Sequence, residues 1–187
     1  MVPKGVQNIE RLVALAEATG LPGNAINSLR LLAEQFRDTK MKIEDVTAEI
    51  NRASETDAVA RRLKTIPGIG PITSSVLAAT LPDATGFKTG RDLAAWLGLT
   101  PKPHSSGGKE RLGKISKMGN RYIRRLLYLG AMGVIAARRR RSAGDDWLWQ
   151  LLDRKPVKLV AIALASRNAR TVWALLKSGE SYQAART

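Results

Sequence analysis

Apolar residues recur in steps of three and four along most of this 187-residue chain, and that spacing is the period of an amphipathic helix. The first such segment covers residues 9–16 and is closed by Gly20 and Pro22. No stretch alternates apolar and polar residues as a half-buried strand does. The sequence therefore predicts an all-α fold, with a helical hairpin or coiled coil at residues 1–58 and a helical domain at residues 59–187.

A long helical pattern occupies residues 27–50. Its apolar positions alternate steps of three and four over three heptads, as in a coiled-coil seam weakened by the polar Thr39; they are Leu29, Leu32, Phe36, Ile43, Val46 and Ile50. Such a seam needs a partner helix, which is either a second copy of the chain or the preceding segment folded back within the same chain. We expect a homo-oligomer through residues 27–50, with the intramolecular hairpin as the alternative.

The stretch LKTIPGIGPITSSVLAAT, residues 63–80, predicts two helices joined by a tight turn. Pro71 stands at the favoured first position of the second helix, and Gly68 and Gly70 permit the left-handed angles and close approach that the turn needs. Amides at such a turn and at the following helix N-terminus suit a DNA phosphate. The pattern resembles the helix-hairpin-helix of DNA repair and recombination proteins, so we expect both glycines to contact DNA. The alternative is a tight turn between helices without a ligand.

Further helices are expected after this turn. A short one is expected to place Phe87, Leu93, Trp96 and Leu97 in the core. For Trp96 the alternative is a platform on which a base stacks, and the core is the expected place. Asn120 is suited to cap another helix, in which Gly130 and Gly133 permit a second backbone to lie close by. A last long helix is predicted over residues 156–176.

Basic residues are concentrated in one block of the chain. The formal net charge is +15, and residues 101–141 hold 12 basic residues against a single acidic one. A field of this sign attracts a polyanion, because each phosphate that is neutralised releases a counterion. We therefore expect nucleic acid as the partner, with a solvated basic face as the alternative.

The amino-acid composition argues against several classes of protein. The chain has no cysteine and one histidine, which excludes a disulfide framework and argues against thiolate or histidine-rich metal sites. Its longest apolar runs are interrupted by Arg or Gly well before 18 residues, so we expect no membrane association. The absence of cysteine fits a cytoplasmic protein, which is the expected setting.

The stretch PKPHSSGG, residues 101–108, has too many Pro and Gly residues for a helix and predicts a loop. A serine hydroxyl in such a loop can attack a phosphodiester if a base accepts its proton and cations cover the phosphate oxygens. From the chemistry alone, a Ser-Ser-Gly-Gly loop is usually a plain turn. The cations that we expect to contact DNA here are Lys109, Arg111, Lys114, Lys117, Arg121 and Arg124.

Residues 66–131, from IPGIGPITSSVLAAT to RRLLYLGA, resemble the C-terminal transposase domain of the IS110 class of bacterial insertion sequences. The run VKLVAIALASRNARTVWALL, residues 157–176, is similar to the closing helix of that domain. The resemblance implies that Ser106, directly before the Gly-Gly pair, is the nucleophile, with Ser105 the less favoured of the two and His104 a candidate to orient it. It also implies DNA recombination guided by an RNA from the element's ends, and dimer contacts through the preceding helices.

Full-length members of this class begin with a RuvC-like domain whose acidic residues bind Mg²⁺, and residues 1–60 lack its β-rich pattern. We therefore expect this chain to be a C-terminal piece, either a truncated product or an excised fragment. No cofactor is expected in the chain itself, and Mg²⁺ is expected only together with the acidic domain. On this interpretation the chain alone binds nucleic acid and cuts poorly or not at all. The alternative is a non-catalytic helical module for DNA binding and dimerisation.

Overall fold

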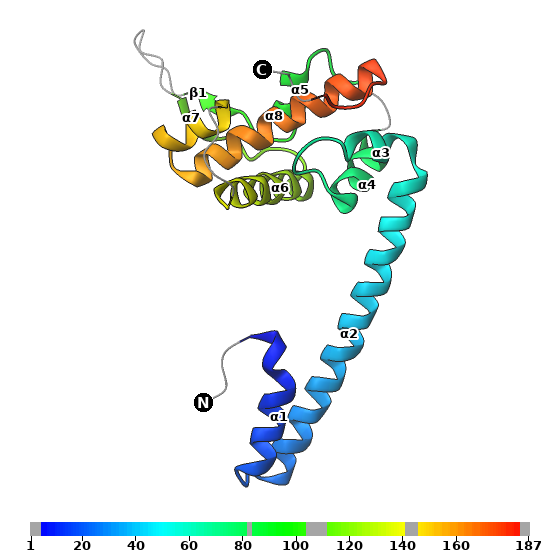
Figure 1. Ribbon diagram of the computed structural model, residues 1–187, viewed down its shortest axis with the longest axis vertical. Helices are drawn as coiled ribbons and strands as arrows, with labels where there is room; N and C mark the ends of the chain where they lie inside the picture. The colour runs from blue at the N-terminus through cyan, green and yellow to red at the C-terminus, as the bar shows by residue number, and fades with distance from the viewer. Residues whose placement is uncertain (1–4, 82–83, 104–111, 141–145, 184–187) are drawn as a thin grey trace. The chain divides into compact units, whose positions relative to one another are not determined.

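The computed structural model describes residues 5–81, 84–103, 112–140 and 146–183. It is mostly helical, which confirms the all-α prediction (Figure 1). A 3-10 turn at Val6–Asn8 leads into the helices α1 (Ile9–Ala18), α2 (Gly23–Thr56), α3 (Ala58–Leu63), α4 (Pro71–Thr80), α5 (Gly90–Trp96), α6 (Arg121–Arg139), α7 (Trp147–Arg154) and α8 (Val157–Ser178). The chain divides into two compact units, Met1–Glu49 and Ile50–Thr187, which are described separately.

The first unit is a helical hairpin, in which α1 lies against the beginning of α2 (Figure 1). Two ion pairs join the helices: Arg37 donates to Glu10 at 2.8 Å, and Arg30 lies 2.7 Å from Glu17. The pairing is antiparallel, because the later residue of α1 contacts the earlier residue of α2. The intramolecular hairpin that the sequence left open is therefore present, while the homo-oligomer stays a prediction.

Much of the predicted seam on α2 is still exposed in this unit. The large apolar side chains that face solvent along α2 are Leu31, Leu32, Met41, Ile43 and Val46. The contact with α1 buries the small side chains Ala16 and Ala33 instead. A second helix could therefore pack on α2 without displacing α1.

α2 continues through the polar run at its end as far as Thr56, and Asp57 then caps α3 by accepting a hydrogen bond from the Ala60 amide at 2.9 Å. The division between the two compact units falls after Glu49, inside α2. The predicted domain boundary after residue 58 coincides instead with the start of α3.

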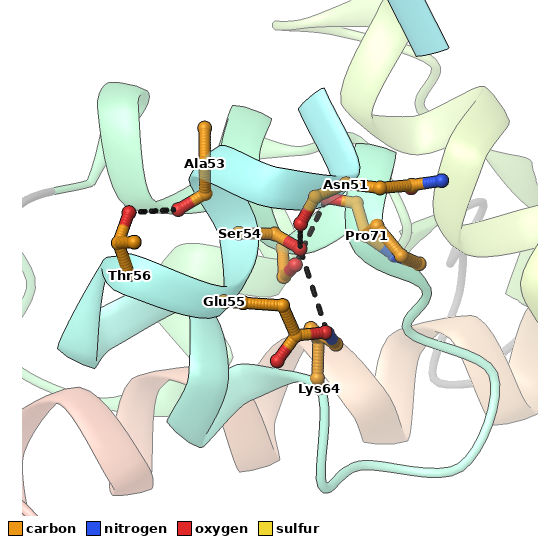
Figure 2. Close-up of polar contacts among 8 residues, drawn as sticks. Asn51, Ala53, Ser54, Glu55, Thr56, Lys64 and Pro71 are labelled. Carbon is orange, nitrogen blue, oxygen red and sulfur yellow. Dashed lines mark hydrogen bonds and ion pairs between the residues drawn. The ribbon is translucent and has the colours of Figure 1, made fainter. Parts of the chain in front are cut away.

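Polar contacts hold the end of α2 against the residue that follows α3 (Figure 2). The Ser54 side chain is fully buried and donates to the Asn51 carbonyl at 2.7 Å. Lys64 reaches the Ser54 hydroxyl at 3.5 Å and forms an ion pair with Glu55. Because the hydroxyl is satisfied and shielded from solvent, we assign it to structure and not to chemistry.

The core of the second unit is built around α8, which packs against α5, α6 and α7. α6 contributes Ile123, Leu127, Ala131 and Ile135, all within 1% of full burial. α8 is long and apolar enough to cross a membrane, but eight of its residues are buried in this core, so its apolar character serves packing. Gly179 ends the helix in the left-handed conformation, close to the predicted end.

Two short strands were not expected. β1 (Pro101–Pro103) pairs antiparallel with β2 (Leu112–Ile115), with Pro101 opposite Ile115 and Pro103 opposite Leu112. Strands of three and four residues, one of them containing two prolines, are too short to reveal an alternating pattern. The residues between them, 104–111, lie outside the described part of the chain.

The prediction that Trp96 belongs to the core is wrong. Its side chain is 40% exposed, whereas Leu93 and Leu97 of the same segment are buried as expected. Trp96 ends α5 and contacts Phe87 edge to face, with ring centroids 5.6 Å apart. Both Trp96 and Leu97 were predicted to be buried, but adjacent residues of a helix point in different directions, and only Leu97 faces the core.

Candidate nucleic-acid interface

The turn between α3 and α4 is packed tightly against α6. Gly68 has a φ of +89°, and a Cβ added at Gly130 would lie 1.8 Å from the Gly68 carbonyl oxygen. The neighbouring Pro67 carbonyl accepts a hydrogen bond from Asn168 of α8 at 3.0 Å. Gly68 and Gly130 therefore allow two backbones to touch, as predicted for Gly130, whereas Gly133 has no atom within 4 Å of its added Cβ.

The other side of this turn faces solvent. Gly70 is exposed and precedes α4, whose first residue is Pro71 as predicted. The amides of Gly70 and Ile72 donate to no group within the described chain. They lie at the positive end of α4, where an anion is favoured, so the phosphate contact of Gly70 stays a prediction, while Gly68 packs against α6.

The base of the serine hairpin, formed by β1, β2 and the segment between them, is fixed to the end of α5. Lys117 donates its amide to the Gly98 carbonyl at 3.1 Å and adopts a left-handed φ of 57°. A Cβ at Gly98 would lie 2.2 Å from the Met118 carbonyl oxygen, and one at Gly119 would lie 1.7 Å from that of Trp96. This close packing orients both ends of the segment that carries residues 104–111.

Arg124, predicted to contact DNA, has a structural role in this packing. One guanidinium nitrogen donates to the carbonyls of Leu97 at 2.9 Å and Met118 at 2.8 Å. Asn120 caps α6 as predicted, because its side chain accepts from the amides of Tyr122 and Ile123. Arg124 thus ties the segment before α6 to the end of α5.

Three of the predicted cations are free to meet a ligand. Lys114, Lys117 and Arg121 are exposed and form no ion pair within the part of the chain that the structure describes. The remaining predicted residues of the loop, which are His104, Ser105, Ser106, Lys109 and Arg111, lie outside the described residues. Their positions are bounded only by β1 and β2 on either side.

A groove of about 540 Å³ lies beside this hairpin. Its walls come from Leu99, from β1 and β2, and from α7 and α8. Four cations line it: Lys114 and Lys117, which were predicted, and Lys155 and Arg170, which the sequence analysis missed. The last two lie outside the basic block, Lys155 directly after α7 and Arg170 on α8. Nothing in their local sequence indicates that the fold brings them close to that block.

The opposite end of α6 carries a further ion pair. Arg138 pairs with Asp146, and the Asp146 carboxylate also caps α7 by accepting from the amides of Leu148 and Trp149. Burial raises the pKa of Asp146, but the contacts with Arg138 and the two amides outweigh burial and hold that pKa below its usual value. Arg138 therefore has a structural partner, and its ion pair with Asp146 links the end of α6 to the start of α7.

Within the described ranges, no group of three or more His, Cys, Asp or Glu side chains could hold a metal ion. The described residues by themselves therefore do not fit a Mg²⁺ site.

Comparison with known proteins identifies the domain that contains this interface. Residues 60–145 match the family described as Transposase IS116/IS110/IS902. The chain carries a transposase domain of this family. The resemblance noted in the sequence is thereby confirmed for the domain, and the matched segment includes the α3–α4 turn and the serine hairpin.

Relatives extend the similarity over nearly the whole chain. A probable family 20 transposase of Pseudomonas aeruginosa is 42% identical over 91% of the chain. The transposase for insertion sequence element IS1328 of Yersinia enterocolitica is 36% identical over 95% of the chain, and that for IS1111A of Coxiella burnetii is 33% identical over 92%. The alignments cover 51%, 54% and 48% of these three proteins, so the chain spans about half the length of the curated relatives it matches.

Proposed function

We propose that this chain is the DNA-binding, serine-bearing part of a DNA transposase, and that Ser106 attacks a DNA phosphodiester when an acidic domain completes the site. The observation that carries the proposal is the hairpin, whose strands flank the Ser-Ser-Gly-Gly segment and whose second strand and following residues bear the exposed Lys114 and Lys117. The family match and the names of the relatives support the same reaction class.

The proposed chemistry is an in-line transesterification. The Ser106 Oγ forms a bond to phosphorus while the bond from phosphorus to one sugar oxygen breaks, and the DNA is left joined to the serine. The serine proton passes to a base, and the leaving sugar oxygen takes up a proton. Cations near the phosphate stabilise the charge that develops on its oxygens, a role that suits Lys109, Arg111, Lys114 and Lys117.

The remaining contacts to DNA follow from the geometry. The exposed Gly70 amide and the start of α4 suit one backbone phosphate, and Arg121 at the exposed start of α6 suits another. Phosphate contacts of this kind position the DNA without reading its sequence. Sequence choice is accordingly assigned to a guide RNA, as the resemblance implies.

Further parts of the proposal concern assembly and setting. The exposed apolar side chains on α2 suit a homo-oligomer through residues 27–50. Mg²⁺ would be held by carboxylates of the acidic domain and would activate the attacking oxygen. We assign the protein to the bacterial cytoplasm, at the nucleoid.

DNA binding is tested by measuring the affinity of the chain for duplex DNA at several salt concentrations. Replacing Lys114 or Lys117 by Ala should reduce the slope of log K against log salt by about 0.9 for each phosphate that the side chain neutralised. Lys42→Ala is the matched control, because Lys42 is exposed on α2 and forms no ion pair within the described residues. Equal slopes for all three variants would refute the predicted contacts.

The second candidate is a helical module that binds DNA and dimerises without chemistry of its own, favoured by the extent of exposed seam on α2. Adding the acidic domain in trans with Mg²⁺ separates the two. Strand transfer that depends on Ser106 supports the proposed reaction. Tight, salt-sensitive binding with no strand transfer supports the module.

A further inference from the structure

The groove beside the serine hairpin is lined by apolar and by cationic side chains. Apolar side chains come from α7 and α8, among them Trp147, Leu151 and Leu159. Two cations come from β2 and the residues after it, Lys114 and Lys117, and two from the end of α7 and from α8, Lys155 and Arg170. The described residues that line it include no carboxylate. A ligand that fits is therefore flat or apolar in the middle and negatively charged at its ends.

The aromatic wall of the groove is held in place. The Arg167 guanidinium lies over the Trp147 ring, 4.9 Å from its centroid, and Asp146 caps the helix that Trp147 begins. A ring fixed in this way loses little freedom when a second ring contacts it. Ser166 adds one polar group to the same wall.

An unpaired nucleotide has the matching chemistry. Its base presents an apolar, stackable surface with polar edges, and the phosphates on either side carry one negative charge each. The volume of about 540 Å³ falls within the range of about 300–1,000 Å³ that is typical of pockets for small molecules. An apolar peptide segment would leave the four cations without partners unless it were also acidic.

The groove lies beside the two strands that flank the proposed nucleophile in the chain. Pro101 of β1 and Gly113 and Lys114 of β2 line it, and the segment with Ser106 runs between these same strands. We propose that the groove binds an unpaired nucleotide of the DNA strand attacked by the serine, with the base against Trp147 and Leu159 and the adjoining phosphates on Lys155 and Arg170. This inference rests on the proposed function and adds the local state of its substrate, a strand opened beside the attacked phosphate.

The test compares two leucines of matched exposure. Leu159 in the groove is 51% exposed and Leu129 on α6, outside the groove, is 50% exposed. Leu159→Glu and Leu129→Glu change the net charge equally. A difference in affinity between the two variants therefore arises from the position of the new carboxylate, inside or outside the groove. Binding of a single-stranded oligodeoxynucleotide, an abasic oligomer of the same length, and a duplex is measured by fluorescence anisotropy.

We expect Leu159→Glu to weaken binding of the single strand roughly 5- to 100-fold more than Leu129→Glu, which is the size expected when one base no longer stacks and the carboxylate repels the strand. The abasic oligomer should show a smaller difference between the variants, because it has the phosphates that the carboxylate repels but no base to stack. In a second pair of variants, Lys155→Ala should weaken binding of the single strand more than Lys158→Ala does. The reason is that Lys155 lines the groove, whereas the exposed Lys158 does not.

The outcomes separate the inference from the proposed function. If all the nucleic acids bind but the two leucine variants lose affinity equally, the groove does not hold a base and is left for a polypeptide partner. If Leu159→Glu lowers the affinity for single-stranded RNA of the same sequence more than the affinity for the DNA, the assignment to the DNA strand is overturned. If neither single strand nor duplex binds the wild-type chain, the proposed function fails together with the inference.

Discussion

The contact between Gly68 and Gly130 allows a sharp test of the packing that positions the α3–α4 turn. In Gly130→Ala, the new methyl group would meet the Gly68 carbonyl oxygen at 1.8 Å, so the turn must retreat from α6 by about 1.2 Å to reach even the shortest tolerated distance of 3.0 Å. That movement strains the hydrogen bond from Asn168 to the Pro67 carbonyl. The turn cannot yield by rotating a side chain, because both atoms in conflict belong to backbone or Cβ positions.

Three contributions determine how much Gly130→Ala changes the free energy of unfolding. Overpacking costs about 1–3 kcal/mol, and the weakened hydrogen bond about 1 kcal/mol. Alanine in place of glycine inside a helix returns about 1 kcal/mol. The free energy of unfolding of Gly130→Ala is therefore expected to fall by about 1–3 kcal/mol.

Gly133→Ala is the matched control, because Gly133 lies on the same helix and its added Cβ has no atom within 4 Å. This variant should gain about 0.5–1 kcal/mol from helix propensity alone. Urea unfolding followed by tryptophan fluorescence measures both, since all four tryptophans lie in the second compact unit. Two variants that shift stability in the same direction would refute the reasoning.

Three further predictions concern other contacts. Asp146→Asn keeps a capping side chain but loses the ion pair with Arg138, which is partly exposed, so it should cost less than about 1 kcal/mol at neutral pH. Because the pKa of Asp146 is depressed in the fold, the stabilising effect is present above its ordinary value of 3.8 and is lost as the pH falls below it. The urea midpoints of wild type and variant should converge on acidification, and midpoints that stayed apart would contradict the reasoning. Arg124→Ala removes the donor to two carbonyls and should cost about 2–3 kcal/mol in the same assay, with an unchanged midpoint as the contrary result. A double variant, Leu32→Glu with Ile43→Glu, should sediment as a monomer at concentrations where wild type forms oligomers, and equal sedimentation would remove α2 as the interface.

Local signals in the sequence were sufficient wherever a neighbour in the chain decides the structure. Asn120 caps α6 because its side chain needs only the two amides that follow it. Pro71 begins α4 and Gly179 ends α8 for equally local reasons of backbone geometry. The nearness of another backbone to Gly130 was also predictable, although its partner, Gly68, was not.

Features that depend on contacts between distant segments could not be predicted from the sequence. The helical pattern of α5 does not indicate that Trp96 lies at the edge of the core. Arg124 looked like one more surface cation, because its two carbonyl partners become neighbours only when α5 and α6 pack together. For the same reason, nothing in the sequence indicates that Lys155 and Arg170 line the groove. The two short strands form because the chain reverses direction and pairs with itself, and they are too short to show an alternating pattern.

The most direct measurement of the central claim is the site of covalent attachment to DNA. A transposition reaction reconstituted with the acidic domain and Mg²⁺ would be stopped, digested with protease and nuclease, and searched by mass spectrometry for a peptide that carries a nucleotide. We predict a phosphodiester on Ser106, absent in Ser106→Ala and present in Ser105→Ala. Recombined DNA formed at the wild-type rate by Ser106→Ala, or an adduct on a different residue, would contradict this claim.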